Sequence, residues 1–252
     1  MIRVATMLVA ALLLTACNNS REQTYQGWIE ANLIFVSPDE SGRIETLSVR
    51  EGQQVAVQAP LFTLDDDLQQ AEVAEREASL RNAQAAYDRA VALLRTNAGT
   101  QKSYEEAEAA MRTAKARLNS SQTRLARRKV FSPVAGSVQQ VYFRVGEIVA
   151  AGRPVVSLLP PGNMKVRFFV NEAMLPRLAL DDAINVSCDG CPSGLTAKIS
   201  FIARTAEYTP PVIYSLEERN KLVFMVEALP EKPESLRVGQ PVSVTMVPRE
   251  QK

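Results

Sequence analysis

The side chains able to do chemistry in this sequence are few, and three of them are cysteines. Cys17 follows an apolar run, whereas Cys188 and Cys191 stand close together with Asp189 and Gly190 between them. Histidine is absent, which removes imidazole bases, His-activated Ser or Cys nucleophiles and every metal site that contains histidine. Enzymatic chemistry would therefore have to rest on carboxylates, lysines or cysteines, and we predict no catalytic residue and no cofactor.

The first 16 residues have the pattern of a secretory signal peptide that ends before Cys17. Arg3 precedes an apolar run from Val4 to Leu14, which is too short to span a bilayer, since spanning takes about 20 residues. The sequence Leu14-Thr15-Ala16-Cys17 resembles a bacterial lipobox, and the resemblance implies cleavage before Cys17 and acylation of that cysteine. We predict an exported lipoprotein with residues 17–24 as its linker. An ordinary signal peptide that contains a chance cysteine is the alternative.

Cys188 and Cys191 have three candidate roles. A metal site would lack two further soft ligands, and a catalytic thiol pair usually begins a helix, whereas this pair lies in a turn between expected strands. Export places the pair in an oxidising compartment, where disulfides persist. We predict a structural disulfide between Cys188 and Cys191 and no bound metal.

The composition is that of a folded protein without a charge surplus. The 252 residues are 46% hydrophobic and 23% charged, and the formal net charge is +1. Phosphate backbones select for a strongly basic surface. We therefore predict that the chain has no nucleic-acid partner.

Residues 37–65 and 132–159 match each other at an offset of 94 residues. Each copy reads as short strands separated by a glycine turn. Because neither copy can bury a core alone, we predict that the two halves face each other in one sandwich. The matched residues are Gly42 with Gly136, Gly52 with Gly146, Val55 with Val149, Pro60 with Pro154 and Leu64 with Leu158.

The segment between the two halves is rich in Ala, Glu, Gln, Arg and Leu, which favours helix. Two heptad seams follow one another: Val73, Leu80, Tyr87 and Leu94, then Tyr104, Met111, Leu118 and Leu125. The seams fit an antiparallel hairpin that turns at Gly99 and places Leu80 opposite Leu118, with a capping box at Ser103. Each arm of roughly 30 residues would reach about 45 Å, more than a small sandwich needs for its own stability.

Together these features resemble the periplasmic adaptors, also called membrane fusion or HlyD-like proteins. The resemblance implies a mainly β fold with an α-helical hairpin. Its parts are a split lipoyl-like (barrel-sandwich hybrid) domain at 37–65 and 130–160, an inserted antiparallel coiled coil at 66–129, and a β-barrel domain from 25–36 and 163–248. A lipoate or biotin carrier shares the lipoyl-like shape, but no Lys stands at the apex of the sandwich.

The resemblance implies a non-enzymatic subunit of a tripartite efflux or secretion system. Such an adaptor links an inner-membrane transporter to a TolC-type outer-membrane channel as a homo-oligomeric ring, of six copies by family resemblance. The stretch from Cys188 to Phe224 resembles the branch that partners ABC-type exporters. The alternatives are the adaptor of a proton-driven (RND or MFS) pump and a purely structural coiled-coil lipoprotein.

The implied location is the periplasm of a Gram-negative bacterium, with the lipid in the inner membrane. Asn18 is not the Asp associated with inner-membrane retention, yet the family role requires inner-membrane attachment.

The residues expected to dock on the outer-membrane channel lie near the hairpin turn. In adaptors of TolC-type channels the tip resembles Arg, three residues, Leu, six residues, then Ser; here Arg89, Leu93 and Thr100 have that spacing. Arg89 and Leu93 share a helix face, and Thr100 keeps the hydroxyl while adding a methyl group. The alternative is that Leu93 is only apolar filler beside Leu94.

Three further clusters have plain structural explanations beside functional ones. Asp65 to Asp67 form a helix start or a cation site, and Arg124, Arg127 and Arg128 complement a helix dipole or form a basic patch. The column Ala71, Ala78, Ala85 and Ala92 reflects helix propensity or a packing surface for a neighbouring protomer.

Overall fold

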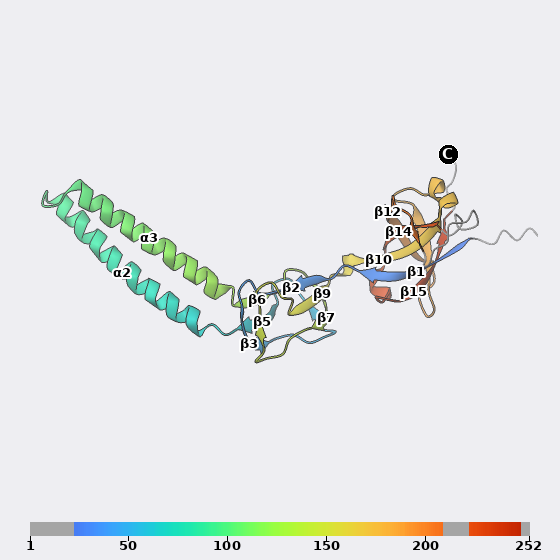
Figure 1. Cartoon of the computed structure of the whole chain (residues 1–252), viewed down its shortest axis with the longest axis horizontal. Coiled ribbons are helices and arrows are strands. Elements are labelled where there is room, and N and C mark those ends of the chain that lie inside the picture. The colour runs from blue at the N-terminus through green and yellow to red at the C-terminus, as the bar shows by residue number, and fades with distance from the viewer. Residues whose placement is uncertain (1–22, 209–221, 248–252) are drawn as a thin grey trace, which may run out of the picture. The chain divides into compact units, whose positions relative to one another are not determined.

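The computed structural model describes residues 23–208 and 222–247 and divides the chain into two compact units. Residues 33–160 form the first unit, which carries the two long helices (Figure 1). The second unit joins the segment before residue 33 to the segment that begins at Pro161. Within the described ranges, no helix combines the length and apolar composition that crossing a bilayer requires.

Two four-stranded antiparallel sheets form a sandwich in the first unit. Their strand orders are β2-β9-β7-β4 and β6-β5-β3-β8. Buried side chains from both sequence halves, among them Phe62 and Leu158, form one core cluster, as the repeat predicts. The strands are β2 (Ile34–Val36), β3 (Gly42–Leu47), β4 (Gln54–Val55), β5 (Pro60–Leu64), β6 (Lys129–Phe131), β7 (Gly136–Val141), β8 (Ile148–Val149) and β9 (Val156–Leu159).

The two sequence halves are interlocked by an exchange of strands. β3 of the first half pairs with β8 of the second, and β4 of the first half pairs with β7 of the second. The exchanges are equivalent at the offset of 94 residues, because Arg43 pairs with Ile148 and Gln54 pairs with Ser137. Neither half can complete its sheets without the other.

One kind of turn precedes both exchanged strands, at residues 50–53 and 144–147. The first residue donates its N–H to the side chain of the fourth, and the fourth donates its N–H to the carbonyl of the first. The third residue is Gly52 or Gly146, with φ of 81° and 90°. Glycine adopts such angles readily because it has no Cβ.

Six strands of the second unit close into an antiparallel barrel. The strand order is β10-β1-β15-β11-β12-β14, and β14 also pairs with β10, which closes the barrel. The short strand β13 pairs with part of β14. Buried and partly exposed residues alternate along β10, the period of a strand with one face in the core. The strands are β1 (Thr24–Ala31), β10 (Met164–Asn171), β11 (Ala183–Ser187), β12 (Leu195–Ile202), β13 (Glu207–Tyr208), β14 (Leu222–Pro230) and β15 (Pro241–Met246). Short 3₁₀ helices at Pro161–Asn163, Glu172–Arg177 and Pro233–Ser235 connect them.

The turn of the sandwich recurs in the barrel, outside the sequence repeat. Residues 179–182 precede β11 and residues 237–240 precede β15, and both have the same reciprocal hydrogen bonds as the sandwich turns. Gly239 has φ of 80°, and Asp181 takes the same position at 66°. The four turns therefore share one backbone design, although only three of them use glycine.

The boundary between the units lies earlier than the sequence indicates. Residues 25–36 are expected in the barrel, but β1 ends at Ala31 and β2 pairs with β9 of the sandwich. Val36 is buried in the sandwich core. Burial of this side chain explains why β2 belongs to the first unit.

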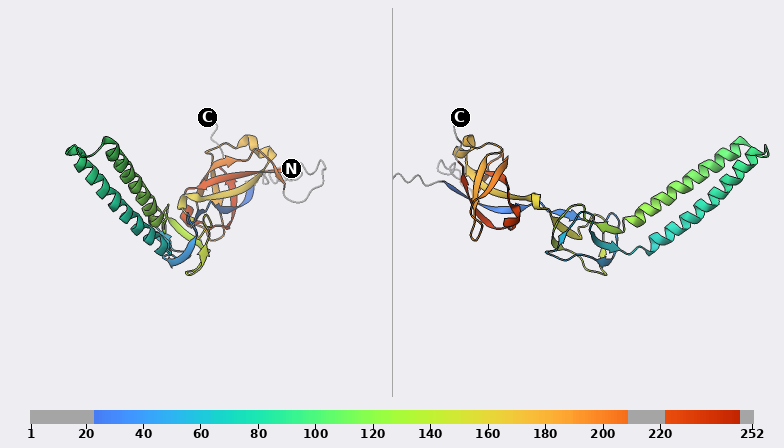
Figure 2. Two further views of the ribbon diagram at one scale, coloured as in Figure 1. Left: turned by 60° about the vertical axis from the view of Figure 1, so that its left-hand side comes forward. Right: turned by 180° about the vertical axis from the view of Figure 1, so that it is seen from behind.

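The two long helices, α2 (Asp67–Arg95) and α3 (Gln101–Ala126), pack side by side as an antiparallel hairpin (Figures 1 and 2). The expected seam residues are the less exposed positions of both helices. No residue of α2 is fully buried, and Ala114 and Ser121 are the buried residues of α3. A two-helix rod has a single covered seam and leaves its remaining surface in water.

The acidic run from Asp65 to Asp67 lies at the start of α2. Asp65 accepts a hydrogen bond from the N–H of Asp67 at 3.3 Å, and Asp66 accepts one from the side chain of Gln70 at 2.6 Å. Carboxylates near a helix N-terminus also complement its dipole. These contacts support the helix-start explanation of the run.

Candidate functional site

The turn between α2 and α3 fixes the position of Leu93 at the end of the rod. Ala98 and Gly99 both donate their N–H to the Leu93 carbonyl, at 2.9 and 3.0 Å. Asn97 has φ of 57°, a left-handed angle that Asn tolerates better than most residues. A Cβ on Gly99 would lie only 3.0 Å from the Leu93 Cβ. Glycine therefore allows the chain to cross closely over Leu93.

Thr100 is the N-cap of α3. Its Oγ1 accepts a hydrogen bond from the N–H of Ser103 at 3.1 Å, and the Ser103 hydroxyl donates to the Thr100 carbonyl at 2.9 Å. The cap thus lies three residues earlier than the capping box expected at Ser103, because Ser103 is already helical. The Thr100 side chain accepts the capping bond, and its hydroxyl hydrogen remains able to donate to a partner.

Leu93 and Arg89 are exposed on α2. Leu93 has 50% of its surface exposed, whereas its neighbour Leu94 is half-buried in the seam. Arg89 is also exposed. Other basic residues of the hairpin form ion pairs one turn along their own helix: Arg76 with Glu72, Arg81 with Glu77, Lys102 with Glu106 and Arg112 with Glu108. Leu93 therefore offers apolar surface at the tip, beside the exposed charge of Arg89.

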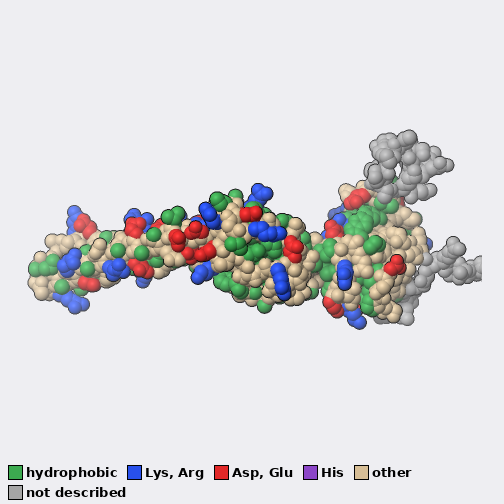
Figure 3. All heavy atoms as spheres, turned by 90° about the horizontal axis from the view of Figure 1, so that it is seen from below, with side chains coloured by type: hydrophobic (Ala, Val, Ile, Leu, Met, Phe, Trp, Pro, Cys, Tyr) green, Lys and Arg blue, Asp and Glu red, His purple; other side chains and the backbone are tan. Residues whose placement is uncertain are grey.

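The hairpin tip has a positive charge balance. Residues 89–104 contain Arg89, Arg95 and Lys102 and no acidic side chain. Lys102 lies 3.7 Å from the Glu106 carboxylate, but both side chains are highly exposed, so water and salt weaken that pair. Acidic and basic side chains are mixed along the rest of the hairpin (Figure 3). The segment at the tip thus combines exposed Leu93 with a surplus of cationic side chains.

Tyr87 and Tyr104 contact each other across the seam, with ring centroids 5.6 Å apart and hydroxyl oxygens 3.4 Å apart. The hydrogen bond to Tyr87 is the main cause that raises the pKa of Tyr104. The expected register places Tyr87 opposite Met111, which is seven residues, or about 10 Å of helix, from Tyr104. The tyrosine contact therefore joins two side chains that the expected register places one heptad apart.

Ala114 and Ser121 are the buried residues of α3. Small side chains at these positions allow the two helices to approach each other closely along the seam.

Three arginines at the C-terminal end of α3 contact the loop before β3. Arg128 is 7% exposed and donates to the Ser41 carbonyl at 2.9 Å. These contacts fix the base of the hairpin to the sandwich, a role beyond the dipole complement expected from the sequence. The ion pairs join Arg124 to Glu40 at 3.7 Å, Arg127 to Asp39 at 3.3 Å and Arg128 to Glu40 at 3.4 Å.

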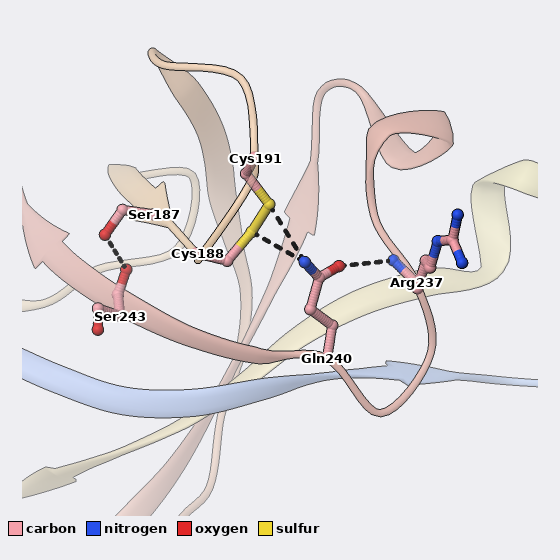
Figure 4. The surroundings of a disulfide bond; sticks show 6 residues. All are labelled: Ser187, Cys188, Cys191, Arg237, Gln240 and Ser243. Atoms are coloured by element: carbon pink, nitrogen blue, oxygen red, sulfur yellow. Dashed lines mark hydrogen bonds between the residues drawn. A yellow bond between two sulfur atoms is a disulfide. The ribbon is translucent and has the colours of Figure 1, made fainter.

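Cys188 and Cys191 form a disulfide in the connection between β11 and β12 (Figure 4). Gln240 donates from Nε2 to the Sγ atoms of both cysteines at 3.3 Å. The Gln240 Oε1 accepts the N–H of Arg237 at 3.0 Å within its turn. The disulfide is thereby connected to the turn that precedes β15.

Cys17, the predicted lipid-attachment residue, lies outside the described residues, together with the signal segment 1–16. Sequence reasoning missed the roles of Arg128 and Gln240. The pattern Arg-x-Gly-Gln, shared by residues 50–53 and 237–240, is a signal that identifies the Gln240 turn. Nothing in the local sequence distinguishes Arg128 from its exposed neighbour Arg127.

The comparison with protein families defines the class of protein. The domain described as "RND MFP, barrel-sandwich hybrid domain" matches residues 32–159, slightly more than half of the chain and almost all of the first unit. The chain belongs to the membrane fusion proteins, the family of periplasmic adaptors.

Individual curated proteins are similar to this chain at moderate sequence identity. A UPF0194 membrane protein of Acidithiobacillus ferridurans is 28% identical over 206 residues, which cover 68% of this chain and 61% of the relative. A protein of Haemophilus influenzae is 27% identical over 155 residues, which cover 62% of this chain and 41% of that relative. The chain thus spans about half of the length of these two curated relatives.

Two solved structures share the fold over most of this chain. A MacA-MexA chimeric protein with the Pseudomonas aeruginosa MexA α-hairpin has a TM-score of 0.70 and 21% identity, over 89% of this chain and 80% of that one. The membrane fusion protein Spr0693 from Streptococcus pneumoniae R6 has a TM-score of 0.69 and 17% identity, over 90% and 99%.

Proposed function

We propose that this chain is the HlyD-like adaptor of a tripartite export system, linking an inner-membrane ABC-type exporter to a TolC-type outer-membrane channel. The hairpin is the observation that carries the proposal. α2 has 29 residues and is about 44 Å long, yet it buries none of its residues fully. A rod of this kind contributes little to the core of its own unit. We therefore infer that its function lies in what its tip contacts.

The tip residues have complementary tasks in this proposal. Leu93 is half exposed and supplies the apolar contact, which is the kind of anchor that dominates small interfaces. Arg89 donates charge-assisted hydrogen bonds to carboxylates or carbonyls of the channel. Thr100 keeps α3 capped and offers one smaller hydroxyl contact.

Acylated Cys17 and self-association complete the arrangement. The lipid holds the chain at the inner membrane from the periplasmic side, and several copies form a homo-oligomeric ring, six by resemblance. In a ring the contacts of one tip are repeated in every copy. A loss of about 1 kcal/mol per tip then has a large effect on assembly through avidity.

An adaptor of a proton-driven pump is the second candidate. The matched domain is described as that of RND membrane fusion proteins, which favours it, whereas the stretch from Cys188 to Phe224 resembles the ABC-partnering branch. Crosslinking in native cells, followed by mass spectrometry of the captured inner-membrane protein, discriminates between them. A captured protein without a nucleotide-binding subunit would favour the proton-driven pump.

The docking proposal is tested with Arg89→Asp and Leu93→Asp combined in one chain. Arg81→Asp with Ala85→Asp is the matched control, since it introduces the same charges at the same spacing on exposed positions of α2, about two turns further from the tip. Export and co-purification of the outer-membrane channel should be lost in the tip variant and retained in the control. Abundance and binding to the inner-membrane transporter should be normal in both.

Full export by the tip variant would show that these residues do not dock. Equal loss in both variants would mean that negative charge anywhere on the rod is harmful, and the tip would have no special role. A purely structural lipoprotein would show no export defect in either chain and would capture no channel.

A further inference from the structure

The disulfide between Cys188 and Cys191 lies in an open part of the barrel surface. The strand pairing of β11 with β12 ends before the disulfide, so the two cysteines belong to the connection between these strands. Both cysteines are partly exposed, and the other residues at 189–194 are exposed. A Cβ added at Gly190 or Gly194 would meet no atom within 4 Å. The pair therefore lies where a partner protein can approach it.

The disulfide closes a very short loop, because Cys188 and Cys191 are only three residues apart. The constraint that a disulfide imposes on the unfolded chain grows with the length of the loop that it closes. The N–H of Cys191 also donates to the Cys188 carbonyl at 3.2 Å, so a hydrogen-bonded turn holds the two residues together without the sulfur–sulfur bond. The barrel is therefore expected to keep its fold when the disulfide is reduced.

The side chain of Gln240 points toward both sulfur atoms (Figure 4). Its Nε2 donates to the Sγ of Cys188 and to the Sγ of Cys191, each at 3.3 Å. The orientation of the amide is fixed, because its Oε1 accepts the N–H of Arg237 at 3.0 Å, and an N–H group only donates. A hydrogen bond becomes stronger when its acceptor carries a negative charge. Gln240 is thus positioned to stabilise a thiolate on either cysteine.

A disulfide is reduced by attack of a thiolate on one sulfur atom, while the other sulfur leaves as a thiolate. Access to the sulfur atoms and stabilisation of the leaving thiolate both speed this step. We propose that Cys188 and Cys191 form a thiol–disulfide exchange site, which a periplasmic dithiol protein reduces while Gln240 stabilises the thiolate that leaves. The inference goes beyond the proposed export function and does not require it.

The exchange has two steps. A thiolate of the dithiol protein bonds to one Sγ, and the bond between Cys188 and Cys191 breaks, which gives a mixed disulfide and one free thiolate. The second thiolate of the dithiol protein then attacks its own sulfur in the mixed disulfide and releases the other cysteine. The dithiol protein ends as a disulfide, and two electrons and two protons have passed to Cys188 and Cys191.

Reduction should act on the turn at residues 237–240 and on β1. Without the sulfur–sulfur bond the two sulfur atoms move apart, so the Gln240 amide keeps only one of its two acceptors. The backbone of the same turn pairs with buried Ile29 of β1: the Gly239 N–H donates to the Ile29 carbonyl at 2.8 Å, and the Ile29 N–H donates to the Gln240 carbonyl at 2.9 Å. The redox state of the pair is therefore linked to the turn before β15 and to β1.

The rate of reduction tests the site. The purified chain from residue 18, which holds only these two cysteines, is mixed with an excess of reduced thioredoxin, and thiols are counted by mass spectrometry after maleimide labelling. The pair should be reduced while far-ultraviolet circular dichroism remains native. Gln240→Glu should slow reduction by about tenfold, because an anion replaces the donor to the leaving thiolate.

Two features make Gln240→Glu a sharp variant. A glutamate preserves the turn, since Glu147 accepts the N–H of Arg144 at 2.9 Å at the equivalent position of the sandwich. Gln53→Glu is the matched control: Gln53 also accepts the N–H of the first residue of its turn, but it lies in the sandwich unit, away from the disulfide. Reduction of the control should proceed at the rate of the unaltered chain.

Amide hydrogen exchange tests the link to the turn. Reduction should raise the exchange rate of the Arg237 N–H by about tenfold, because the side chain that accepts it is held less firmly. The Arg50 N–H is the internal control, since it makes the same bond to Gln53 at 3.2 Å in the other unit. Its exchange rate should not change.

Four results would overturn the proposal. The first is a pair that resists reduced thioredoxin in the folded chain and reacts only in urea, which is the behaviour of a purely structural disulfide. The second is an equal rate of reduction for Gln240→Glu and the unaltered chain. The third is equal slowing by Gln53→Glu, which would assign the effect to net charge. The fourth is unchanged exchange at Arg237 after reduction. Loss of the export function alone would leave all four measurements as they are.

Discussion

Gln58 holds a backbone conformation that its counterpart in the second half achieves with glycine. Gln58 has φ of 63°, and Gly152, which lies 94 residues later, has φ of 74°. Their N–H groups donate to the equivalent carbonyls of Ser132 and Pro38, at 2.8 and 2.9 Å. The two positions therefore differ mainly in the presence of a side chain.

The expected energies follow from this comparison. A residue with a Cβ costs about 1–2 kcal/mol in the left-handed conformation, whereas glycine costs about 0.5–1 kcal/mol through the entropy of the unfolded chain. Gln58→Gly should therefore stabilise the sandwich by about 0.5–1 kcal/mol. Gly152→Gln should destabilise it by a similar amount, with no steric contribution, because a Cβ at Gly152 meets no atom within 4 Å.

Urea unfolding measures both changes. Far-ultraviolet circular dichroism should show midpoint shifts of about 0.3–0.5 M in opposite directions. Trp28 lies in the barrel unit, so its fluorescence transition is an internal control that should not move if the units unfold separately. Destabilisation by Gln58→Gly as large as that by Gly152→Gln would refute the reasoning and show that the Gln58 side chain contributes contacts of its own.

Four further predictions concern single groups. Cys17→Ala should abolish incorporation of labelled palmitate, and an unlabelled mature wild type would refute the lipoprotein assignment. Mass spectrometry without reduction should find Cys188 and Cys191 joined, and Cys188→Ala with Cys191→Ala should cost about 2 kcal/mol in urea unfolding, as a short closed loop predicts. The pKa of Glu227 is lowered from its ordinary value of 4.5, so ionised Glu227 stabilises the fold at pH values above 4.5, and this contribution is lost as pH falls toward the lower folded-state pKa. The melting temperature of Glu227→Gln should therefore depend less on pH in this window than that of the unaltered chain. An equal dependence on pH in the two chains would contradict the prediction. Arg128→Met should destabilise the first unit by about 1–2 kcal/mol in urea, because the hydrogen bond from Arg128 to the Ser41 carbonyl and the contact with Glu40 are lost, whereas the same change at exposed Arg127 should cost much less.

The sequence alone reveals most of the architecture where the pattern is periodic. The offset of 94 residues indicates the paired halves, and the heptads indicate the two helices and their seams. Both signals arise because burial repeats with the period of the backbone. The expected barrel range 163–248 contains the strands β10 to β15, whereas β1 ends at Ala31, five residues before the expected boundary at Val36.

What the sequence does not reveal depends on contacts between distant segments. The register of α2 and α3 depends on how their side chains pack across the seam, and heptads alone allow several alignments. Arg128 and Arg127 are adjacent and identical in type, and only the position of the Ser41 carbonyl decides which becomes buried. The Asp181 turn lacks the glycine that marks its three equivalents, so no pattern exposes it.

The exchange of strands between the two halves has a consequence for how the chain folds. Leu64 donates its N–H to the carbonyl of Arg128 at 2.9 Å, so the halves meet only after the 63 residues between these two come back on themselves. Closing a flexible loop of that length costs about 4 kcal/mol. Helix pairing needs only local contacts, which form early in proteins of low contact order. Pairing of the two helices then brings β6 next to β5 before the sandwich has formed. A variant that weakens the seam should therefore slow folding of the sandwich, even where it leaves the finished fold intact.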